Sequence, residues 1–240
     1  MKKNMLWTGI SLAIMVSTIL AGCTIGTGTT GTQSRDVSGF KHIAINTFGE
    51  MIIQQGDEES LTIQAPSDHL RYIETDVTGD TLNIKTRRGY VGIPTHSVTY
   101  TLTVKDLNEI SFSGAGSIKV YALETDALKL NLSGAGSIEI DSLTADNLEV
   151  NLSAAGAITI AGKVKNEAVT ISGVGGYESG DLESHTASVV MSGAGSAVLW
   201  VTDNLDVTIS GVGSVSYFGS PSVSQNISGL GSVKSKGEHH

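Results

Sequence analysis

A short pattern of serine and glycine recurs seven times in the second half of the chain and constrains the fold more than any other feature. Most copies have the form Ser-Gly-x-Gly-Ser, and their first serines lie 20, 20, 19, 20, 18 and 18 residues apart. A fixed period of this length indicates a solenoid, in which each unit buries its apolar face only against its neighbours. The copies begin at Ser113, Ser133, Ser153, Ser172, Ser192, Ser210 and Ser228.

Apolar residues alternate with polar ones immediately before each copy. Asn131 and Asn151, for example, each lie between two apolar residues. A spacing of two predicts a strand with one face inward, and identical strands stacked coil on coil form parallel sheets. Right-handed crossovers are strongly preferred, so we expect an all-β fold, a right-handed parallel β-helix with about 18–20 residues per coil. The apolar residues that precede the serines are Phe112, Leu132, Leu152, Ile171, Met191, Ile209 and Ile227.

The second glycine of the pattern is present in every copy, and we expect it to be a structural corner. A position that never carries a Cβ has either a positive φ or a close backbone contact. One copy has an alanine, at 154, in place of the first glycine, so we expect the first position to be less demanding of glycine than the second. The invariant column is Gly116, Gly136, Gly156, Gly175, Gly195, Gly213 and Gly231.

Residues 37–108 also have alternating apolar positions but lack the serine-glycine corner. Gly-Asp pairs at 56 and 79 predict turns between these strands. The spacing of the strands is close to the period of the later coils. We therefore expect one domain over 37–236, with irregular N-terminal coils at 37–108 that serve as a cap and regular coils at 109–236.

The first residues of the chain have the order of charge and hydrophobicity of an export signal. Lys2 and Lys3 precede an uncharged apolar stretch that ends at Gly22, so residues 1–22 are predicted to be a signal peptide. A retained transmembrane anchor is the alternative, but the stretch is slightly short for a helix crossing a hydrocarbon core of about 30 Å.

Residues Leu20, Ala21, Gly22 and Cys23 resemble the lipobox of bacterial lipoproteins, in which signal peptidase II cleaves before a diacylated cysteine. The resemblance implies lipidation of Cys23 by palmitate-like acyl chains, and hence the lipid bilayer as a partner. Each buried methylene contributes about 0.8 kcal/mol, so several acyl chains hold a protein on a membrane. Residues 23–36, rich in Gly and Thr, are then expected to be a flexible tether.

The charge and cysteine content exclude two classes of protein. The formal net charge is -9, and removing Lys2 and Lys3 with the leader leaves -11. Such a surface repels phosphate backbones, so nucleic acid is not expected as a partner. The chain has a single cysteine, so an exported domain cannot form an internal disulfide.

The lipobox, the segment from Phe40 to Gly56 and the repeated coils together resemble the putative auto-transporter adhesin, head GIN domain family. The opening segment ends in Ile-Ile-Gln-Gln-Gly, and the resemblance covers roughly 37–235. The family is found in bacterial surface or periplasmic lipoproteins, often of Bacteroidetes. It implies a β-helical fold and adhesion, and it supplies no catalytic residues and no cofactor.

The repeated glycines and serines do not form a known site for phosphate, metal or catalysis. None of the glycine loops is followed by the Lys-Ser/Thr of a phosphate-binding loop. The stretch 173–181 is similar to a calcium-binding nonapeptide but occurs only once, and His42, His69, His96 and His185 lack metal-ligand spacing. Seven equivalent serines without a recurrent histidine suit a ladder of hydroxyls bonded to the corner backbone better than a nucleophile.

Glu139 and Asp141 are the candidates for an enzyme, because β-helices host polysaccharide lyases and hydrolases that use clustered carboxylates. Solvated outward charges are the preferred interpretation of this pair. We therefore expect a protein that is not an enzyme and has neither a metal nor a cofactor.

Trp200, Tyr217 and Phe218 are the candidate ligand-binding residues. Trp200 and Phe218 occupy one column in successive coils, hence about 4.8 Å apart, together with Tyr121, Asp141, Ala161 and Gly180 in earlier coils. Aromatic faces can stack on sugar rings or on a protein partner. The alternative is an aromatic stack that seals the C-terminal coils.

Three functions follow from these features, in decreasing order of support. The first is an adhesin-like binding module for a glycan or surface protein, lipid-anchored in the cell envelope, at the outer membrane or cell surface. The second is a structural envelope component, a homo-oligomer that associates through the ends of its solenoid. The third is a carbohydrate-active enzyme.

Overall fold

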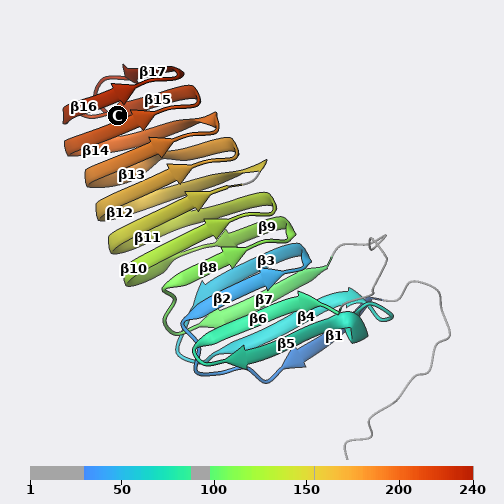
Figure 1. Cartoon of the computed structure of the whole chain (residues 1–240). Helices are drawn as coiled ribbons and strands as arrows, with labels where there is room; N and C mark the ends of the chain where they lie inside the picture. The colour runs from blue at the N-terminus through green and yellow to red at the C-terminus, as the bar shows by residue number, and fades with distance from the viewer. Residues whose placement is uncertain (1–29, 88–97, 154, 240) are drawn as a thin grey trace, which may run out of the picture.

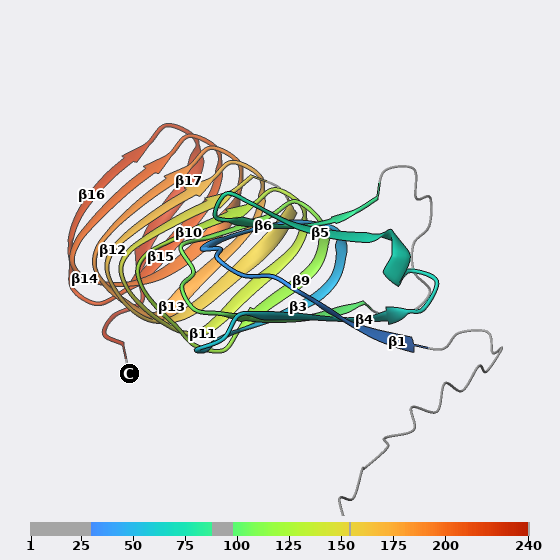
Figure 2. The same ribbon diagram turned by 90° about the horizontal axis from the view of Figure 1, so that it is seen from below.

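The computed structural model describes residues 30–87, 98–153 and 155–239, and most of these residues lie in strands. The strands stack rung on rung into an elongated solenoid (Figure 1). Figure 2 shows the successive coils as loops of similar outline, offset along the stack. Cys23 and the lipobox residues Leu20, Ala21 and Gly22 lie outside the described residues.

The regular part of the solenoid consists of strands that pair in parallel with their equivalents one coil away. Ile138, for example, pairs with both Ile118 and Ile158. The strands β11 to β14 run from one serine-glycine corner to the next, which confirms the predicted parallel solenoid. Its strands are β8 (Glu109–Phe112), β9 (Ala115–Val120), β10 (Leu123–Leu132), β11 (Ala135–Leu152), β12 (Ala155–Ile171), β13 (Val174–Met191), β14 (Ala194–Ile209), β15 (Val212–Phe218), β16 (Ser222–Ile227) and β17 (Leu230–Ser235).

The N-terminal part differs from simple coils because it mixes parallel and antiparallel pairs. Two of its strands pair in parallel with β8 and β9 and so continue the stack. Beyond them, β1 pairs with β4, β4 with β7 and β5 with β6, all antiparallel. These strands are β1 (Thr30–Arg35), β2 (His42–Asn46), β3 (Phe48–Gln55), β4 (Ser60–Pro66), β5 (Ile73–Thr78), β6 (Thr81–Thr86) and β7 (Thr99–Val104), with a 3-10 helix η1 (Leu70–Tyr72).

The predicted tether at 23–36 is wrong for its last part, because residues 30–35 form β1. The Arg35 guanidinium donates through Nη2 to the carbonyl oxygens of Leu70 and Ile73, at 3.3 and 3.1 Å. Strand pairing is a backbone interaction, so this segment needs no large apolar side chain to join the sheet. Residues 23–29 lie outside the described part of the chain.

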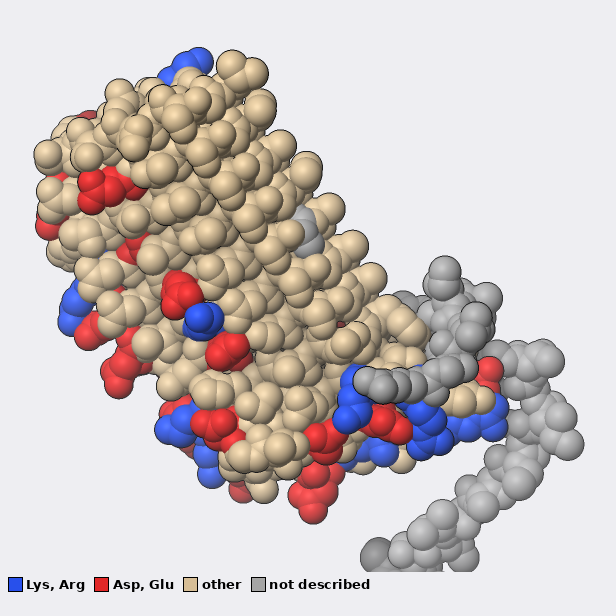
Figure 3. Space-filling model, in the orientation of Figure 1, with Lys and Arg blue, Asp and Glu red and all other residues tan. Residues whose placement is uncertain are grey.

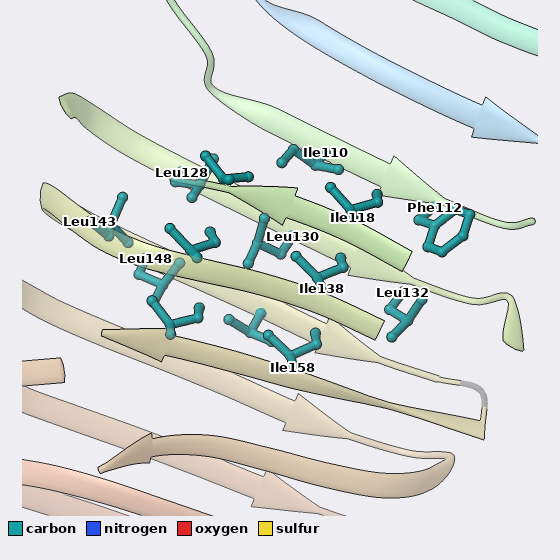
Figure 4. Packing of buried hydrophobic residues seen from close by; sticks show 14 of the residues in the cluster. Ile110, Phe112, Ile118, Leu128, Leu130, Leu132, Ile138, Leu143, Leu148 and Ile158 are labelled. Carbon is teal, nitrogen blue, oxygen red and sulfur yellow. The ribbon is translucent and has the colours of Figure 1, made fainter. Parts of the chain in front are cut away.

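A continuous aliphatic core fills the solenoid. Side chains from consecutive coils lie above one another inside the loops (Figure 4). Burying each large aliphatic side chain contributes about 1.5–3 kcal/mol, so stacked columns of this kind can hold the coils together without a disulfide. One such column is Ile110, Leu130, Val150, Val169, Val189 and Val207, all at most 2% exposed.

The glycine corners have a different geometry from a positive-φ turn. The strands break at the serine and the first glycine, and the second glycine already belongs to the next strand. In the second-glycine column only Gly116 has a positive φ, at 142°. A Cβ on Gly136 would lie 2.1 Å from the carbonyl oxygen of Gly116. Close approach between coils therefore excludes side chains from this column, and a positive φ adds to this constraint at Gly116.

The first glycine column is confined in the same way. A Cβ on Gly134 would lie 2.0 Å from the carbonyl oxygen of Gly114, and one on Gly193 would lie 2.0 Å from that of Gly173. The expectation that this position is less demanding is therefore wrong for these glycines. Ala154, on which that expectation was based, lies outside the described residues.

Candidate functional site

The two outward aromatic residues of the last coils lie side by side, as the repeat predicts. Trp200 in β14 pairs with Phe218 in β15, and both side chains are partly exposed. An outward-facing pair of rings can stack on a flat ligand.

Tyr217 does not belong to this pair. It pairs with the buried Leu199, and its side chain packs against the hydrophobic core. Side chains alternate along a strand, so the residue before an outward Phe218 faces inward. Tyr217 is therefore a core-packing residue and does not form part of the outward aromatic pair.

The ring of His239, near the C-terminus, already covers the aromatic pair. It stacks on Trp200 with ring centroids 3.9 Å apart and an interplanar angle of 4°. It also meets Phe218 edge to face at 5.4 Å, and its Nε2 lies 3.3 Å from Oδ1 of Asp181. The site thus holds a flat ring by its face and by its polar edge.

An irregularity in the ladder changes the predicted column of these aromatics. Ser179 pairs with Leu199, but Trp200 pairs with Glu183, and Ala161 pairs with Asp181 and not with Gly180. Gly180 instead lies beside Phe218, where an added Cβ would be 3.4 Å from the ring. The extra residues between the paired positions bring Asp181 to the His239 ring.

A groove of about 640 Å³ adjoins the aromatic pair. Its acidic lining includes Glu139, Asp141, Glu178, Asp181 and Glu238. An acidic hollow with an aromatic wall favours ligands that combine a flat ring with a hydrogen-bond donor or a positive charge.

Glu139 and Asp141, the candidates for an enzyme, are brought together by a lysine. Nζ of Lys119 contacts Oε1 of Glu139 at 2.6 Å and also Oδ1 of Asp141. The hydrogen bonds to Asp141 and Glu139 raise the pKa of the Lys119 ammonium. The three side chains form a surface ion-pair cluster, and the structure gives no support for a general acid and base at this position.

The serine column bonds mainly through its backbone. The N–H of Ser133 donates to the carbonyl oxygen of Phe112 at 2.9 Å, and later serines repeat the contact. The hydroxyls of Ser113 and Ser153 donate to carbonyl oxygens at 3.3 and 3.5 Å, so among the described residues the predicted hydroxyl ladder is present only as long bonds at these two positions.

A buried polar cluster, which the sequence motifs did not predict, lies inside the solenoid. The carboxyl group of Glu167 is inside the core, with the residue 2% exposed. The hydroxyls of Tyr177 and Ser179 donate to its Oε1 at 2.6 and 2.8 Å. Its Oε2 is buried and has no hydrogen-bond partner among the described residues. An unpaired carboxylate oxygen in such a place is costly when it carries charge.

Burial raises the pKa of Glu167 to about 6, although the hydrogen bonds from Tyr177 and Ser179 oppose this shift. The pKa of Tyr177 is raised well above its usual range, first by burial and then by the nearby carboxylate. The Ser179 hydroxyl also lies 3.0 Å from the carbonyl oxygen of Val198, yet it has only one hydrogen to donate. When Glu167 is protonated, the bond between Glu167 and Ser179 reverses: the carboxyl group donates to the Ser179 hydroxyl, which then donates its one hydrogen to the carbonyl oxygen of Val198.

The repeat contains the signal that would have found this cluster. Five residues before the serine, the coils that end at Ser133 to Ser210 have an inward column, and Glu167 interrupts it between Leu148 and Ala187. Five residues after the serine, Tyr177 follows Ile158 in another inward column.

A larger hollow of about 1240 Å³ lies where β10 to β12 meet the N-terminal part. Its lining includes Tyr121, 51% exposed, and the side chain of Gln55, which bonds to the backbone of Glu124. On the face drawn in Figure 3, charged side chains gather toward this N-terminal end, and the upper coils show few. Within residues 30–87, 98–153 and 155–239, no three His, Cys, Asp or Glu side chains are placed to hold a metal ion.

The profile of the family described as putative auto-transporter adhesin, head GIN domain matches residues 39–221. The chain belongs to this family. The resemblance seen in the repeat and in the opening segment is therefore confirmed. The family describes adhesins, which indicates a protein of the cell surface or envelope with a binding role.

Solved structures support the same fold for this adhesin-family chain. A putative adhesin from Bacteroides fragilis is 28% identical, with a TM-score of 0.82 over 86% of this chain and 97% of that one. A putative adhesin from Parabacteroides merdae has 22% identity and a TM-score of 0.68, over 88% and 97% of the two chains. A putative lipid binding protein from Parabacteroides distasonis has 22% identity and a TM-score of 0.62, over 88% and 98%.

Among curated proteins, no relative matches this chain. In the part of the chain that the structure describes, no helix has the length and hydrophobicity to cross a membrane.

Proposed function

We propose that this chain is a lipid-anchored binding protein of the cell envelope that uses the outer side of its solenoid to hold a glycan. The observation that carries the proposal is the ring site, which we define as Trp200, Phe218 and Asp181. A flat ring stacks there at 3.9 Å on an outward tryptophan. Sugar rings are bound in the same manner, with one face on an aromatic side chain and a polar edge on a carboxylate.

The membership of an adhesin family supports the binding role, and the acidic groove supports a small polar ligand over an extended apolar one. The alternative of a carbohydrate-active enzyme has less support, since Lys119 pairs with both carboxylates of the candidate.

A glycan array tests the proposal. Trp200→Ala should abolish or strongly reduce binding, because the platform for the ring is lost. Tyr121→Ala is the control, since it removes an exposed aromatic side chain that lies in the other hollow. Unchanged binding by Trp200→Ala, or equal loss by Tyr121→Ala, would refute the ring site.

The anchor is a separate part of the proposal and rests on the lipobox at Leu20 to Cys23. Cys23→Ala should prevent acylation and move the protein from the membrane fraction to the soluble fraction, because each buried methylene of the lipid contributes about 0.8 kcal/mol. Metabolic labelling with a palmitate analogue, followed by fractionation, measures both effects. A Cys23→Ala protein that stays labelled and in the membrane fraction would contradict the anchor.

Self-association through the solenoid end is a second candidate. Among the described residues, β17 pairs only with β15, and Leu230 in its first position is 78% exposed. An unpaired edge with an exposed apolar side chain can pair with a second chain. Sedimentation of the unlipidated protein distinguishes the two: a monomer that binds glycan excludes end-to-end assembly as the main role.

A further inference from the structure

The C-terminal segment 236–239 is attached to the outside of the last coils. The N–H of Lys236 donates to the carbonyl oxygen of Tyr217 at 2.8 Å, and the N–H of Gly219 donates to that of Gly237 at 2.9 Å. Gly237 has a φ of 87°, a conformation that favours glycine. Figure 2 shows the C-terminal end outside the loops of the stack.

Two more contacts fix the end of this segment. The hydroxyl of Ser220 donates to Oε1 of Glu238 at 2.7 Å, and Nζ of Lys236 lies 5.2 Å from the centroid of the Phe218 ring. The His239 side chain is 22% exposed, whereas the side chain of Asp181 beside it is 83% exposed. The imidazole is therefore mostly covered, and the site opens to solvent at the Asp181 carboxylate.

The position of His239 shows what the ring site selects. The ring face lies flat on Trp200, and the ring nitrogen Nε2 points to Asp181. A cation above a tryptophan face and beside a carboxylate gains from both. A neutral sugar would also stack on Trp200, but it would offer Asp181 only a hydroxyl donor and no positive charge.

The charge of the neighbouring groove also favours a positively charged ligand. Lys119 offsets Glu139 and Asp141, but among the ion pairs of the described residues none involves Glu178 or Glu238. Lys236 also lines the groove, but the five carboxylates outnumber Lys119 and Lys236, so the groove keeps a negative charge that attracts a positive ligand.

We propose that His239 is a tethered occupant of the ring site, and that the glycan which displaces it carries amino sugars with free ammonium groups. This inference rests on the proposed function and names its ligand class. The ammonium takes the place of Nε2 beside Asp181, and the pyranose ring takes the place of the imidazole on Trp200.

Trp200 itself reports the occupancy. The chain has two tryptophans, Trp7 and Trp200, so Trp7→Phe in the full chain leaves Trp200 as the sole indole. In that background His239→Ala should increase the quenching of Trp200 fluorescence by acrylamide. His185→Ala, which removes an exposed histidine paired with Asp203, should leave quenching unchanged. Equal quenching with and without His239 would overturn the tethered occupant.

Binding of oligosaccharides tests the ligand class. The probes are chitosan oligomers and chitin oligomers of equal length, which differ in the charge of the amino group. Chitosan oligomers should bind more tightly, and His239→Ala should tighten their binding about two- to twelvefold, the range of a stacked aromatic pair converted to affinity. Asp181→Asn should remove the preference for the charged oligomer.

The outcomes distinguish a failure of the amino-sugar ligand class from a failure of the glycan-binding function on which it rests. Equal affinity for the two oligomers, lost in Trp200→Ala, would keep the ring site and overturn the amino-sugar class. Binding of neither oligomer would overturn the amino-sugar class, and a glycan found on the array would then decide whether the ring site survives. Preference for chitosan that Asp181→Asn leaves unchanged would overturn the role of Asp181.

Discussion

The coil of β11 and the coils of β12 and β13 follow the same backbone path but enclose different side chains. β11 encloses aliphatic residues such as Ile138 and Leu148, while the next two coils enclose Glu167 and Tyr177. The ladder still pairs Leu148 with Glu167 and Ile158 with Tyr177. The corners and the backbone ladder therefore set the path, and the interior accepts a polar group when its hydrogen bonds are mostly satisfied.

The largest expected effect tests the claim that the glycine corners set the path of the backbone. Gly136→Val should destabilise the protein by about 4 kcal/mol, because its Cβ would lie 2.1 Å from a backbone oxygen that cannot move without shifting a coil. Thermal and urea unfolding measure the change.

Two glycine variants are the controls for that experiment. Gly134→Ala should destabilise less than Gly136→Val, because it adds only one carbon to an equally crowded site. Gly176→Ala should be nearly neutral, since its Cβ would meet only the Ser196 hydroxyl at 3.8 Å. Melting temperatures of Gly136→Val and Gly134→Ala equal to that of Gly176→Ala would contradict the account of the corner, because only the first two place a Cβ against a backbone oxygen.

The second prediction concerns the pH dependence of the polar coils. The folded protein holds the Glu167 proton more tightly than the unfolded chain, with a pKa of about 6 against 4.5. The contribution of Glu167 to stability is therefore greatest below pH 4.5 and falls as pH rises through 6. One pKa unit corresponds to about 1.4 kcal/mol, so the loss is about 2 kcal/mol.

Glu167→Gln is the variant that sharpens this test, because it keeps an acceptor for Tyr177 and removes the titration. Urea unfolding from pH 4 to 7.5 should show the loss in the parent protein, and the difference between parent and variant should follow the same curve. A pH-independent difference would show that Glu167 does not titrate in this range.

The third prediction concerns a single hydroxyl, whose effect is smallest when Glu167 is neutral. Tyr177→Phe removes the donor that lies 2.6 Å from Oε1 of Glu167, and should cost about 1.5–3 kcal/mol when the carboxyl is charged and less when it is neutral. Tyr100→Phe is the comparison in the N-terminal part, where the hydroxyl contacts Thr47 at 3.1 Å and burial raises the tyrosine pKa to about 12. The cost of Tyr100→Phe should be independent of pH between 4 and 7.5, and the cost of Tyr177→Phe should increase with pH.

Much of the fold could be predicted, and part of the site could not. The period of the serine-glycine pattern predicted the solenoid and the pairing of Trp200 with Phe218, because equivalent residues of a repeat stack. It failed at Gly180, where the ladder contains extra residues, and at residues 30–35, whose composition suggested a tether. Neither departure changes the apolar period from which the prediction was made.

The sequence alone determined the stacking of the coils, since a repeated alternation can bury its apolar face in only one way. The tertiary structure decided three other features: the antiparallel cap, the burial of Glu167 and the covering of Trp200 by His239. Each depends on residues brought together from separate coils or from the end of the chain, such as Asp181 and His239. Contacts of that kind follow from the three-dimensional path of the backbone and leave no period in the sequence.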